Sequence, residues 1–478
     1  MFSLSCSAET FSVTAYVGDP TAGRTGARIA EVHSDLKSTL VLLDSGDEQL
    51  AIVTSPLGIE CREMHAAICT ALAETLGLRK EQVFAITSHD HCVPNAVDDA
   101  VCDWQKPAGI VRPGTINPLG QAFVAGLRGA ALRLRAQLKP VTLEWGRAQE
   151  SRITFNRRGR RPDGRAYFIR EEDRLLLDPG YIGEIDPDAV VAVFRDEARR
   201  AVAALAFYTG HPVTAYNPER MVVWGEWPQV ACEQLSAKLG GAPVAFLQGC
   251  CGNINSKYML GGTVAQSREL GGFLGDAFGR AVDSARPSVR TDLRRHLATV
   301  QLPLAPLPGV PALEKDLAEI DTFIRRGQAG DETALECVGM NFPRALTPPY
   351  RAKLVEMIRP WFVSALQAHR EGRAHLAPRA LPVEILVARI GDLGLVGLPF
   401  EPFVRIGLKI KREAALPCVL PCGYTNGAHG YIPDASACDD REYMAGFFRY
   451  TAGRPPFSAP AGDAAASAAV AILAEVSR

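Results

Sequence analysis

Two histidines separated by one residue are the clearest candidates for chemistry in this chain of 478 residues. His89 and His91 follow an apolar segment, Val83 to Ile86, which predicts a buried strand. Residues i and i+2 of an extended chain point to the same side, so both imidazoles would face one space, and Pro94 prevents a regular continuation. Two convergent imidazoles can bind one metal ion together. Alternatively, one imidazole binds the metal ion while the other transfers protons. The alternative interpretation is two unrelated polar histidines in a surface loop.

Three further apolar segments also lead into residues that can bind a metal ion or a substrate. They are 201–208 before His211, 243–247 before the glycine-rich loop 248–255, and 393–398 before Glu401. Reactive groups at strand ends along one edge of a sheet are how α/β enzymes build their sites. Histidines and a glutamate from distant strands suit a catalytic zinc that keeps one position open for water.

Two other loops carry further polar side chains. Residues 156–165 form a basic loop, which fits a solvated segment or one that presents an arginine to a carboxylate or a carbonyl oxygen. Residues 423–431 form a glycine-rich loop with two tyrosines and a histidine. We find no Gly-x-Ser-x-Gly nucleophile motif, so attack by water suits this sequence better than a covalent nucleophile.

The elements that would position these residues alternate between strands and helices. Strands are predicted at 38–44, 50–54, 190–194 and 383–390, and helices at about 64–76, 119–138, 227–239, 270–282, 402–412 and 462–476. Gly77 is well placed to end the first of these helices. Residues 312–374 have a mostly helical pattern with many charges, so we expect a mostly helical insertion at about 305–380.

The composition limits the kinds of partner. Hydrophobic residues make up 47% of the chain and charged residues 22%, which is typical of a soluble globular protein. A net charge of −1 argues against nucleic acid or an anionic membrane as the main partner. No segment offers the roughly 18 apolar residues of a membrane helix, and we find no secretory signal. The twelve cysteines show no spacing typical of a disulfide framework, which suits reduced thiols and predicts a cytoplasmic protein. We expect its partner to be a small molecule. A homo-oligomer is compatible with the sequence.

The order and spacing of the motifs resemble the neutral/alkaline (non-lysosomal) ceramidase family, in particular its short bacterial members that lack the C-terminal immunoglobulin-like domain. The similar segments run nearly end to end along the chain. They are Val32 to Leu36, His89 to Pro94, Phe155 to Arg158, Gly210 to Pro212, Phe246 to Asn255, Gly397 to Glu401 and Gly430 to Pro433. The resemblance implies a mixed α/β fold, with mixed β-sheets flanked by helices, in a single catalytic domain of residues 1–478.

The resemblance also implies a role for each matching position. One Zn²⁺ per chain would be bound by His89, His211, Glu401 and Tyr431. His91 would be the acid/base beside the hydrolytic water, and Arg157 would bind the substrate carbonyl or stabilise the oxyanion. The family's second tyrosine corresponds to Tyr443 or Tyr450, and local spacing does not decide between them. We predict substrate contacts for Asp90, Asn156, Gln248 and Asn253.

Four positions near the implied site depart from the family pattern. Asp90 and Cys92 replace small hydroxyl residues, Asn253 stands where an aspartate is usual, and Phe400 replaces a glycine. None of these changes removes an implied metal ligand, so we expect the hydrolytic chemistry to be retained. The substrate is left open, and Asp90 also suits a role in orienting a histidine.

The expected activity is hydrolysis of an amide, an N-acyl bond, by metal-activated water. The substrate is a lipid-like ceramide or, at least as readily, a smaller soluble N-acyl compound, because the sequence has no export signal, anchor or evident basic amphipathic patch. The same machinery could open an ester or a lactone, or run in reverse to form an amide.

Two other classes of function stay open. A dinuclear metallohydrolase would require the motif His-x-His-x-Asp-His, whereas here His91 is followed by Cys92-Val93-Pro94. A non-catalytic, metal-stabilised binding protein is less consistent with the presence of all four implied ligands and His91. Metal content without turnover of any N-acyl amide would favour that second class.

Overall fold

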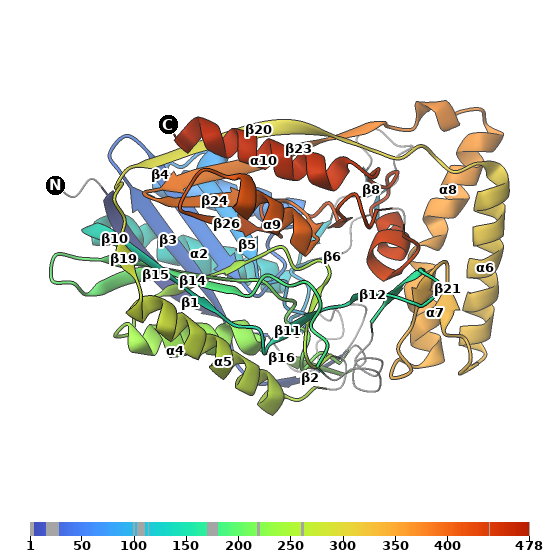
Figure 1. The fold of residues 1–478 in the computed structure, drawn as a ribbon, viewed down its shortest axis with the longest axis horizontal. Helices are drawn as coiled ribbons and strands as arrows, with labels where there is room; N and C mark the ends of the chain where they lie inside the picture. Colours follow the sequence, from blue (N-terminus) through green and yellow to red (C-terminus); the bar gives the residue numbers. More distant parts are fainter. Residues whose placement is uncertain are drawn as a thin grey trace.

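A large mixed sheet forms the centre of the molecule (Figure 1). The computed structural model describes residues 4–15, 28–98, 101–102, 110–112, 114–169, 180–217, 220–259, 262–438 and 440–477. The strand order is β17 (Val244–Gln248), β15 (Ala201–Tyr208), β14 (Asp188–Arg195), β10 (Lys139–Gln149), β1 (Leu4–Val13), β3 (Leu36–Asp44), β4 (Gln49–Ser55) and β5 (Val83–Thr87), with β19 (Arg286–Pro287) beside β10. β17 is parallel to β15 and β5 is parallel to β4. The sheet curves until β17 approaches β3, where the Thr39 hydroxyl donates to the Val244 carbonyl over 3.0 Å.

A second sheet of four strands packs against one face of the first. Its order is β20 (Leu293–Pro303), β23 (Ala380–Ile390), β24 (Leu393–Gly397) and β26 (Cys418–Cys422). Apolar side chains from both sheets form one buried cluster, which includes Ile52, Phe84, Leu205, Leu386 and Leu395. Burial of each such side chain contributes about 1.5–3 kcal/mol, so this interface is a main core of the protein.

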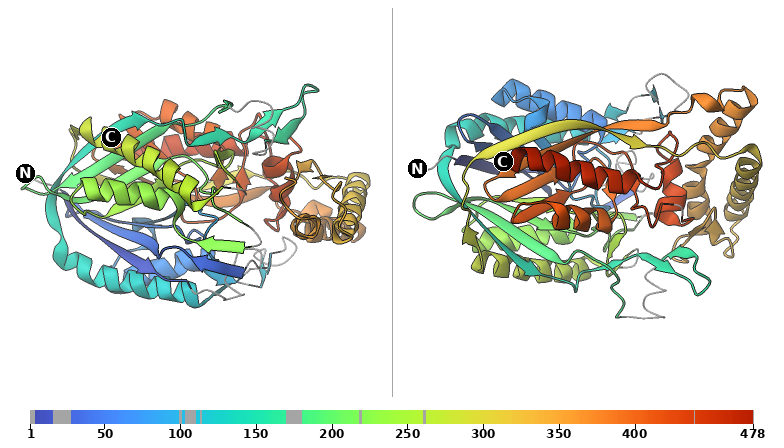
Figure 2. Two further views of the ribbon diagram at one scale, coloured as in Figure 1. Left: turned by 90° about the horizontal axis from the view of Figure 1, so that it is seen from below. Right: turned by 45° about the horizontal axis from the view of Figure 1, so that its top comes forward.

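Helices cover the outer faces of both sheets (Figures 1 and 2). The pairs are α1 (Arg62–Leu76) and α2 (Pro118–Gln137) on β3, β4 and β5, α4 (Glu226–Lys238) and α5 (Val264–Asp283) on β14, β15 and β17, and α9 (Val404–Glu413) and α10 (Ala461–Ser477) on the four-stranded sheet. The expected mixed α/β fold, with sheets flanked by helices, is confirmed.

The ends of the first two helices follow from local sequence. Gly77 ends α1 with φ 72°, a left-handed conformation that glycine adopts without steric cost. The side chain of Asn117 accepts hydrogen bonds from the backbone N–H groups of Leu119 and Gly120 at the start of α2. Both helix ends lie within two residues of the predicted positions.

Three helices form a layer of their own at one end of the molecule (Figure 1). They are α6 (Val310–Gln328), α7 (Pro348–Glu356) and α8 (Arg359–Arg370). Their apolar side chains pack together in a separate core that also contains Phe447 and Tyr450. These helices lie within the stretch where we expect the insertion, and a single domain over the whole chain stays a prediction.

Short strand pairs connect the remaining loops. They are β2 (Arg28–Val32) with β16 (Arg220–Val223), β6 (Val97–Asp98) with β9 (Thr115–Ile116), β7 (Val101–Cys102) with β8 (Ile110–Arg112), β11 (Thr154–Asn156) with β18 (Ile254–Ser256), β12 (Arg158–Arg160) with β13 (Ala166–Phe168), β21 (Glu336–Cys337) with β22 (Met340–Asn341), and β25 (Glu401–Pro402) with β27 (Tyr431–Ile432). Single helical turns occur at Lys80–Gln82, Ala374–Leu376, Tyr443–Phe447 and Phe448–Tyr450. Within the described ranges, no helix combines the length and apolar character needed to cross a bilayer.

Candidate metal centre

The loop after β5 carries His89 and His91 in a tight turn. His89 adopts φ 58°, in the left-handed region, which costs a non-glycine residue about 1–3 kcal/mol. The hydroxyl of Thr87 accepts a hydrogen bond from the backbone N–H of His89 over 3.1 Å and supports this turn. The two imidazole centroids lie 5.1 Å apart. The rings do converge, but through a turn at His89 and not through the extended chain that we expected.

His211 follows β15 and is held with one defined ring nitrogen facing the protein backbone. Its Nδ1 lies 2.7 Å from the carbonyl oxygen of Cys251 and 3.1 Å from that of Ile254. Because a carbonyl oxygen only accepts hydrogen bonds, Nδ1 carries the proton and Nε2 carries the lone pair. Burial, together with the charge of Arg157, lowers the pKa of His211 to about 3, so the ring is neutral at physiological pH.

Glu401 brings a carboxylate to the same place from β25. Its Oε2 lies 3.3 Å from Nε2 of His89 and 3.6 Å from Nε2 of His211. Burial by itself raises the pKa of this carboxyl, but the electrostatic attraction and contacts of the two histidines outweigh it and hold the pKa well below its usual value. Glu401 is therefore ionised at neutral pH.

These donor atoms fit a divalent metal ion. Among the described residues, Nε2 of His211 and Oε2 of Glu401 are buried and make no hydrogen bond. Tetrahedral zinc–ligand distances of about 2.0–2.2 Å place neighbouring donor atoms about 3.3–3.6 Å apart, which matches the separations from Glu401. The ring nitrogens of His89, His91 and His211 also lie within 4.8 Å of one another. These three histidines could hold a metal ion, and Glu401 lies within 3.6 Å of two of them.

Tyr431 and Arg157 lie on the Glu401 side of this centre. Tyr431 is paired in register with Glu401 in the parallel pair β25–β27. Nη2 of Arg157 donates to the Tyr431 hydroxyl oxygen over 2.9 Å and to the carbonyl of Gly252 over 2.6 Å, and Nη1 donates to Oδ1 of Asn255 over 3.0 Å. The guanidinium is buried, so these hydrogen bonds fix a positive charge beside the phenol oxygen.

Two of the side chains predicted to contact substrate instead bind backbone groups. Oδ1 of Asp90 accepts a hydrogen bond from the N–H of Cys92 over 2.7 Å. Oδ1 of Asn253 accepts one from the N–H of Val404 over 2.8 Å, at the first residue of α9. Both contacts hold the loops around the histidines and Glu401 in place, and substrate contact by Asp90 or Asn253 stays a prediction.

Asn156 and Gln248 have backbone partners as well. Nδ2 of Asn156 donates to the carbonyl of Glu184 over 2.9 Å. Gln248 is fully buried behind the two histidine loops, where its amide bonds to the backbone of Ser88 and Gly210. A role in substrate binding stays a prediction for both residues.

The two tyrosines considered as a second active-site tyrosine lie beside the helical layer. Tyr450 is buried between Trp361 and Phe362 of α8, with ring centroids 4.5 and 4.7 Å away. These contacts give Tyr450 a packing role in the core of α6, α7 and α8. The side chain of Tyr443 lies outside the part of the chain that the structure describes. A catalytic role stays a prediction for both.

Two other tyrosines contact the histidines directly, and the sequence did not single them out. The ring of Tyr424 stacks on His89 with centroids 4.3 Å apart, and Tyr216 meets His91 edge-on at 5.1 Å. Tyr424 lies in the glycine-rich loop 423–431, and the composition of this loop was the sequence feature that could have identified it as a site residue. Tyr216 lies five residues after His211, and no sequence feature marks it as a site residue. Aromatic walls of this kind restrict the histidine rings to defined orientations.

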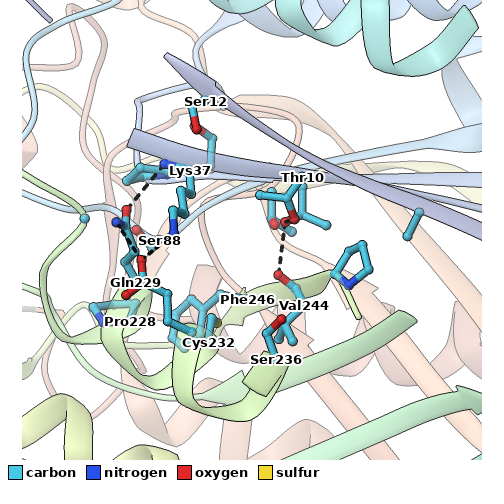
Figure 3. A pocket seen from close by; sticks show the side chains of 18 of the residues that line it. Thr10, Ser12, Lys37, Ser88, Pro228, Gln229, Cys232, Ser236, Val244 and Phe246 are labelled. Carbon is cyan, nitrogen blue, oxygen red and sulfur yellow. Dashed lines mark hydrogen bonds and ion pairs between the residues drawn. The ribbon is translucent and has the colours of Figure 1, made fainter. Parts of the chain in front are cut away.

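A cleft of about 820 Å³ opens between α4 and strands β1, β3 and β4 (Figure 3). Thr10, Lys37 and Gln229 are among the side chains that line it. Ser88, next to His89, also lines it, whereas none of the donor residues His89, His211 and Glu401 is among the described residues at its wall. This cleft is therefore separate from the metal centre.

Comparison with known proteins links the fold to ceramidases. No family model matches the sequence. The chain is similar to a solved structure of neutral ceramidase from Pseudomonas aeruginosa, with a TM-score of 0.67 and 17% identity over 98% of this chain and 74% of the other. A ceramidase complexed with C2 is similar at a TM-score of 0.68 and 17% identity, over 99% of this chain and 75% of the other. At this identity the likeness establishes the fold, and membership of the family stays a prediction.

Proposed function

We propose that this protein is a metal-dependent hydrolase that cleaves an N-acyl amide bond, with one Zn²⁺ bound by His89, His211, Glu401 and Tyr431. The observation that carries the proposal is the position of Oε2 of Glu401, which lies 3.3 Å from Nε2 of His89 and 3.6 Å from Nε2 of His211. The likeness of the fold to two ceramidases supports the same chemistry. When bound, a divalent metal ion supplies a Lewis acid that polarises a carbonyl oxygen and lowers the pKa of a water molecule.

His91 is the proton carrier in this proposal. Its ring lies 5.1 Å from that of His89 and 5.8 Å from that of His211, and it is less buried than either. It accepts a proton from the water whose oxygen attacks the acyl carbon, and it returns that proton to the amine nitrogen as the C–N bond breaks. The products are a carboxylic acid and an amine.

Arg157 stabilises the charge that develops on the acyl oxygen. Its guanidinium already donates to the Tyr431 hydroxyl oxygen at 2.9 Å, so it acts from beside that group and does not need to reach the substrate itself. A buried positive charge interacts more strongly with a developing oxyanion than an exposed one does. Tyr431, next to Glu401 in the strand pair, holds the charge of Arg157 close to the donor atoms.

The substrate belongs to the N-acyl compounds, with ceramide and smaller soluble N-acyl amides as the two groups to compare. The test is elemental analysis of the purified protein together with turnover of a panel that contains both groups. We expect about one zinc per chain and release of a free amine from at least one member. His89→Ala should lose metal and turnover, whereas His375→Ala, at an exposed position in the turn after α8, should keep both. Full metal content and full turnover in His89→Ala would contradict the proposal.

A further inference from the structure

Two buried side chains connect the loop of His89 and His91 to the loop of His211. The first is Gln248, the last residue of β17, which is paired in register with Tyr208 at the end of β15. Nε2 of Gln248 donates to the carbonyl of Ser88 over 2.6 Å and to the carbonyl of Gly210 over 2.9 Å. These two carbonyls belong to the residues directly before the two metal-binding histidines. One amide therefore spans both loops on their entry side.

The second connecting side chain is Glu226, the first residue of α4. Its Oε1 accepts hydrogen bonds from the backbone N–H of Ala215 over 2.6 Å and from the thiol of Cys92 over 3.5 Å. Cys92 directly follows His91, and Ala215 lies on the chain leaving His211. One carboxyl group therefore joins the same two loops on their exit side.

The backbone around Glu226 indicates that this contact is imposed by the surrounding structure. Glu226 adopts φ 49°, a left-handed conformation that is costly for a residue with a side chain. Its side chain is fully buried. Such features persist only where the fold gains from the position of the group.

We propose that Gln248 and Glu226 are positioning residues that fix the separation of the His89 and His211 donor atoms, from opposite ends of the two histidine loops. This inference rests on the metal-binding part of the proposed function. Partners behind the ligands of a metal site typically change its affinity about 10–100-fold when removed. Removing the Gln248 amide leaves the two buried carbonyls without their donor, so only links such as the 3.1 Å bond from the N–H of His91 to the carbonyl of Pro212 still join the loops, and the fit of the donor atoms to zinc becomes worse.

The experiment compares Gln248→Met with Gln82→Met. Gln82 is also buried, and its amide donates to the carbonyl of Gln49 over 3.2 Å and accepts from the N–H of Arg79 over 3.0 Å. It lies just before β5, whereas His89 follows the other end of the same strand. Both variants lose a buried amide with backbone partners, but only Gln248→Met removes a link between the histidine loops.

The readouts are the Zn²⁺ dissociation constant, from competition with a chromogenic chelator, and the thermal midpoint of the metal-free protein. We expect about 10–100-fold weaker zinc binding in Gln248→Met and unchanged binding in Gln82→Met, even if both lower the thermal midpoint equally. Co²⁺ in place of zinc should also show an altered visible absorption spectrum in Gln248→Met. Gln248→Glu, which keeps the size but loses both N–H donors when ionised, should shift zinc affinity in the same direction.

Glu226 offers a test by conservative replacement. Glu226→Gln keeps the Oε1 acceptor for Ala215 and Cys92 and should bind zinc within about twofold of the wild type, whereas Glu226→Leu should bind it about tenfold more weakly. Wild-type zinc affinity in both Gln248→Met and Glu226→Leu would overturn the inference and leave the proposed function standing. Absence of zinc binding by the wild-type protein would overturn the two together.

Discussion

Two buried polar clusters in this protein balance their charges in opposite ways. Behind the His211 loop, Lys411 of α9 lies 2.6 Å from a carboxylate oxygen of Asp186 and 2.9 Å from one of Asp188. The hydroxyl of Thr209 also contacts Asp186 over 3.3 Å. Arg147 also lies 3.6 Å from a carboxylate oxygen of Asp188, so two cations face the two carboxylates and the cluster is balanced without any added ion.

The donor centre lacks such an internal partner. Glu401 is ionised, yet among the described residues its ion-pair contacts are two histidines, and His211 is neutral because burial lowers its pKa to about 3. A buried carboxylate requires compensation, and the geometry fits a cation that enters from solution. The difference teaches that acids paired with their own cations indicate a structural role, whereas an acid whose ion-pair contacts, among the described residues, are only histidines is a candidate metal ligand.

Removing the carboxylate of the donor centre should have the largest effect. We expect Glu401→Ala to bring turnover of N-acyl amides to background and to abolish stoichiometric zinc, because it deletes a donor between His89 and His211. Elemental analysis and amine release are the measurements. Glu384→Ala, at an exposed carboxylate on β23 paired with Lys80, is the control and should leave both unchanged.

Removing Lys411 from its cluster with Asp186 and Asp188 should lower the stability of the fold and leave metal binding unchanged. Lys411→Met leaves the buried Asp186 without a cationic partner, while Asp188 keeps Arg147, and this should lower the free energy of unfolding by about 3–5 kcal/mol. Lys409→Met, on the same helix, removes a more exposed pair with Asp463 and should cost less than about 1 kcal/mol. Denaturant titration measures both, and a loss of zinc in Lys411→Met would erase the distinction between the clusters.

Changing the charged group beside Tyr431 should reduce turnover with the metal retained. Arg157→Lys keeps the positive charge but cannot reproduce the forked hydrogen bonds to Tyr431, Gly252 and Asn255. We expect kcat to fall about 100-fold, equivalent to about 2.7 kcal/mol, with unchanged zinc content. The adjacent Arg158, paired with Asp440, is the control, since Arg158→Lys should change kcat less than threefold. Equal losses in the two variants would contradict the assignment.

The last prediction concerns pH. Burial raises the pKa of Glu226 to about 8, above its ordinary value of 4.5. Between these values the folded protein keeps a proton that the unfolded chain has released, so the stabilising contribution is complete below about pH 4.5 and is lost as pH rises through about 8. Thermal unfolding of the metal-free protein should show this decline with rising pH, and Glu226→Gln should flatten it. An unchanged slope in Glu226→Gln would mean that other groups cause the decline.

Apolar runs in the sequence were sufficient to locate the strands that lead into the donor centre. The segments before His89, His211 and Glu401 are β5, β15 and β24, and the helix ends at Gly77 and Asn117 follow from cap chemistry. These features depend on neighbours within a few residues, which periodicity and capping describe. The resemblance of the motifs to the ceramidase family then predicted which distant strand ends meet.

Other features depend on partners far away in the chain. Strands β1, β10 and β20 mix polar and apolar residues, and their register comes from neighbouring strands, so local pattern did not predict them. The left-handed turn at His89 is stabilised by its surroundings against its own preference. Gln248 has the polarity of a substrate-binding residue, and only its position behind Ser88 and Gly210 reveals its backbone partners.

The two-residue pairing of Glu401 with Tyr431 has a consequence for how this site can change. The backbone N–H of Glu401 donates to the carbonyl of Gly430, directly before Tyr431, over 3.0 Å, while the chain between Glu401 and Tyr431 makes a long excursion through α9 and β26. Because α9 and β26 pack in the core and Tyr424 stacks on His89, only the segments between these elements can change in length without disturbing the surroundings of the Glu401–Tyr431 pair.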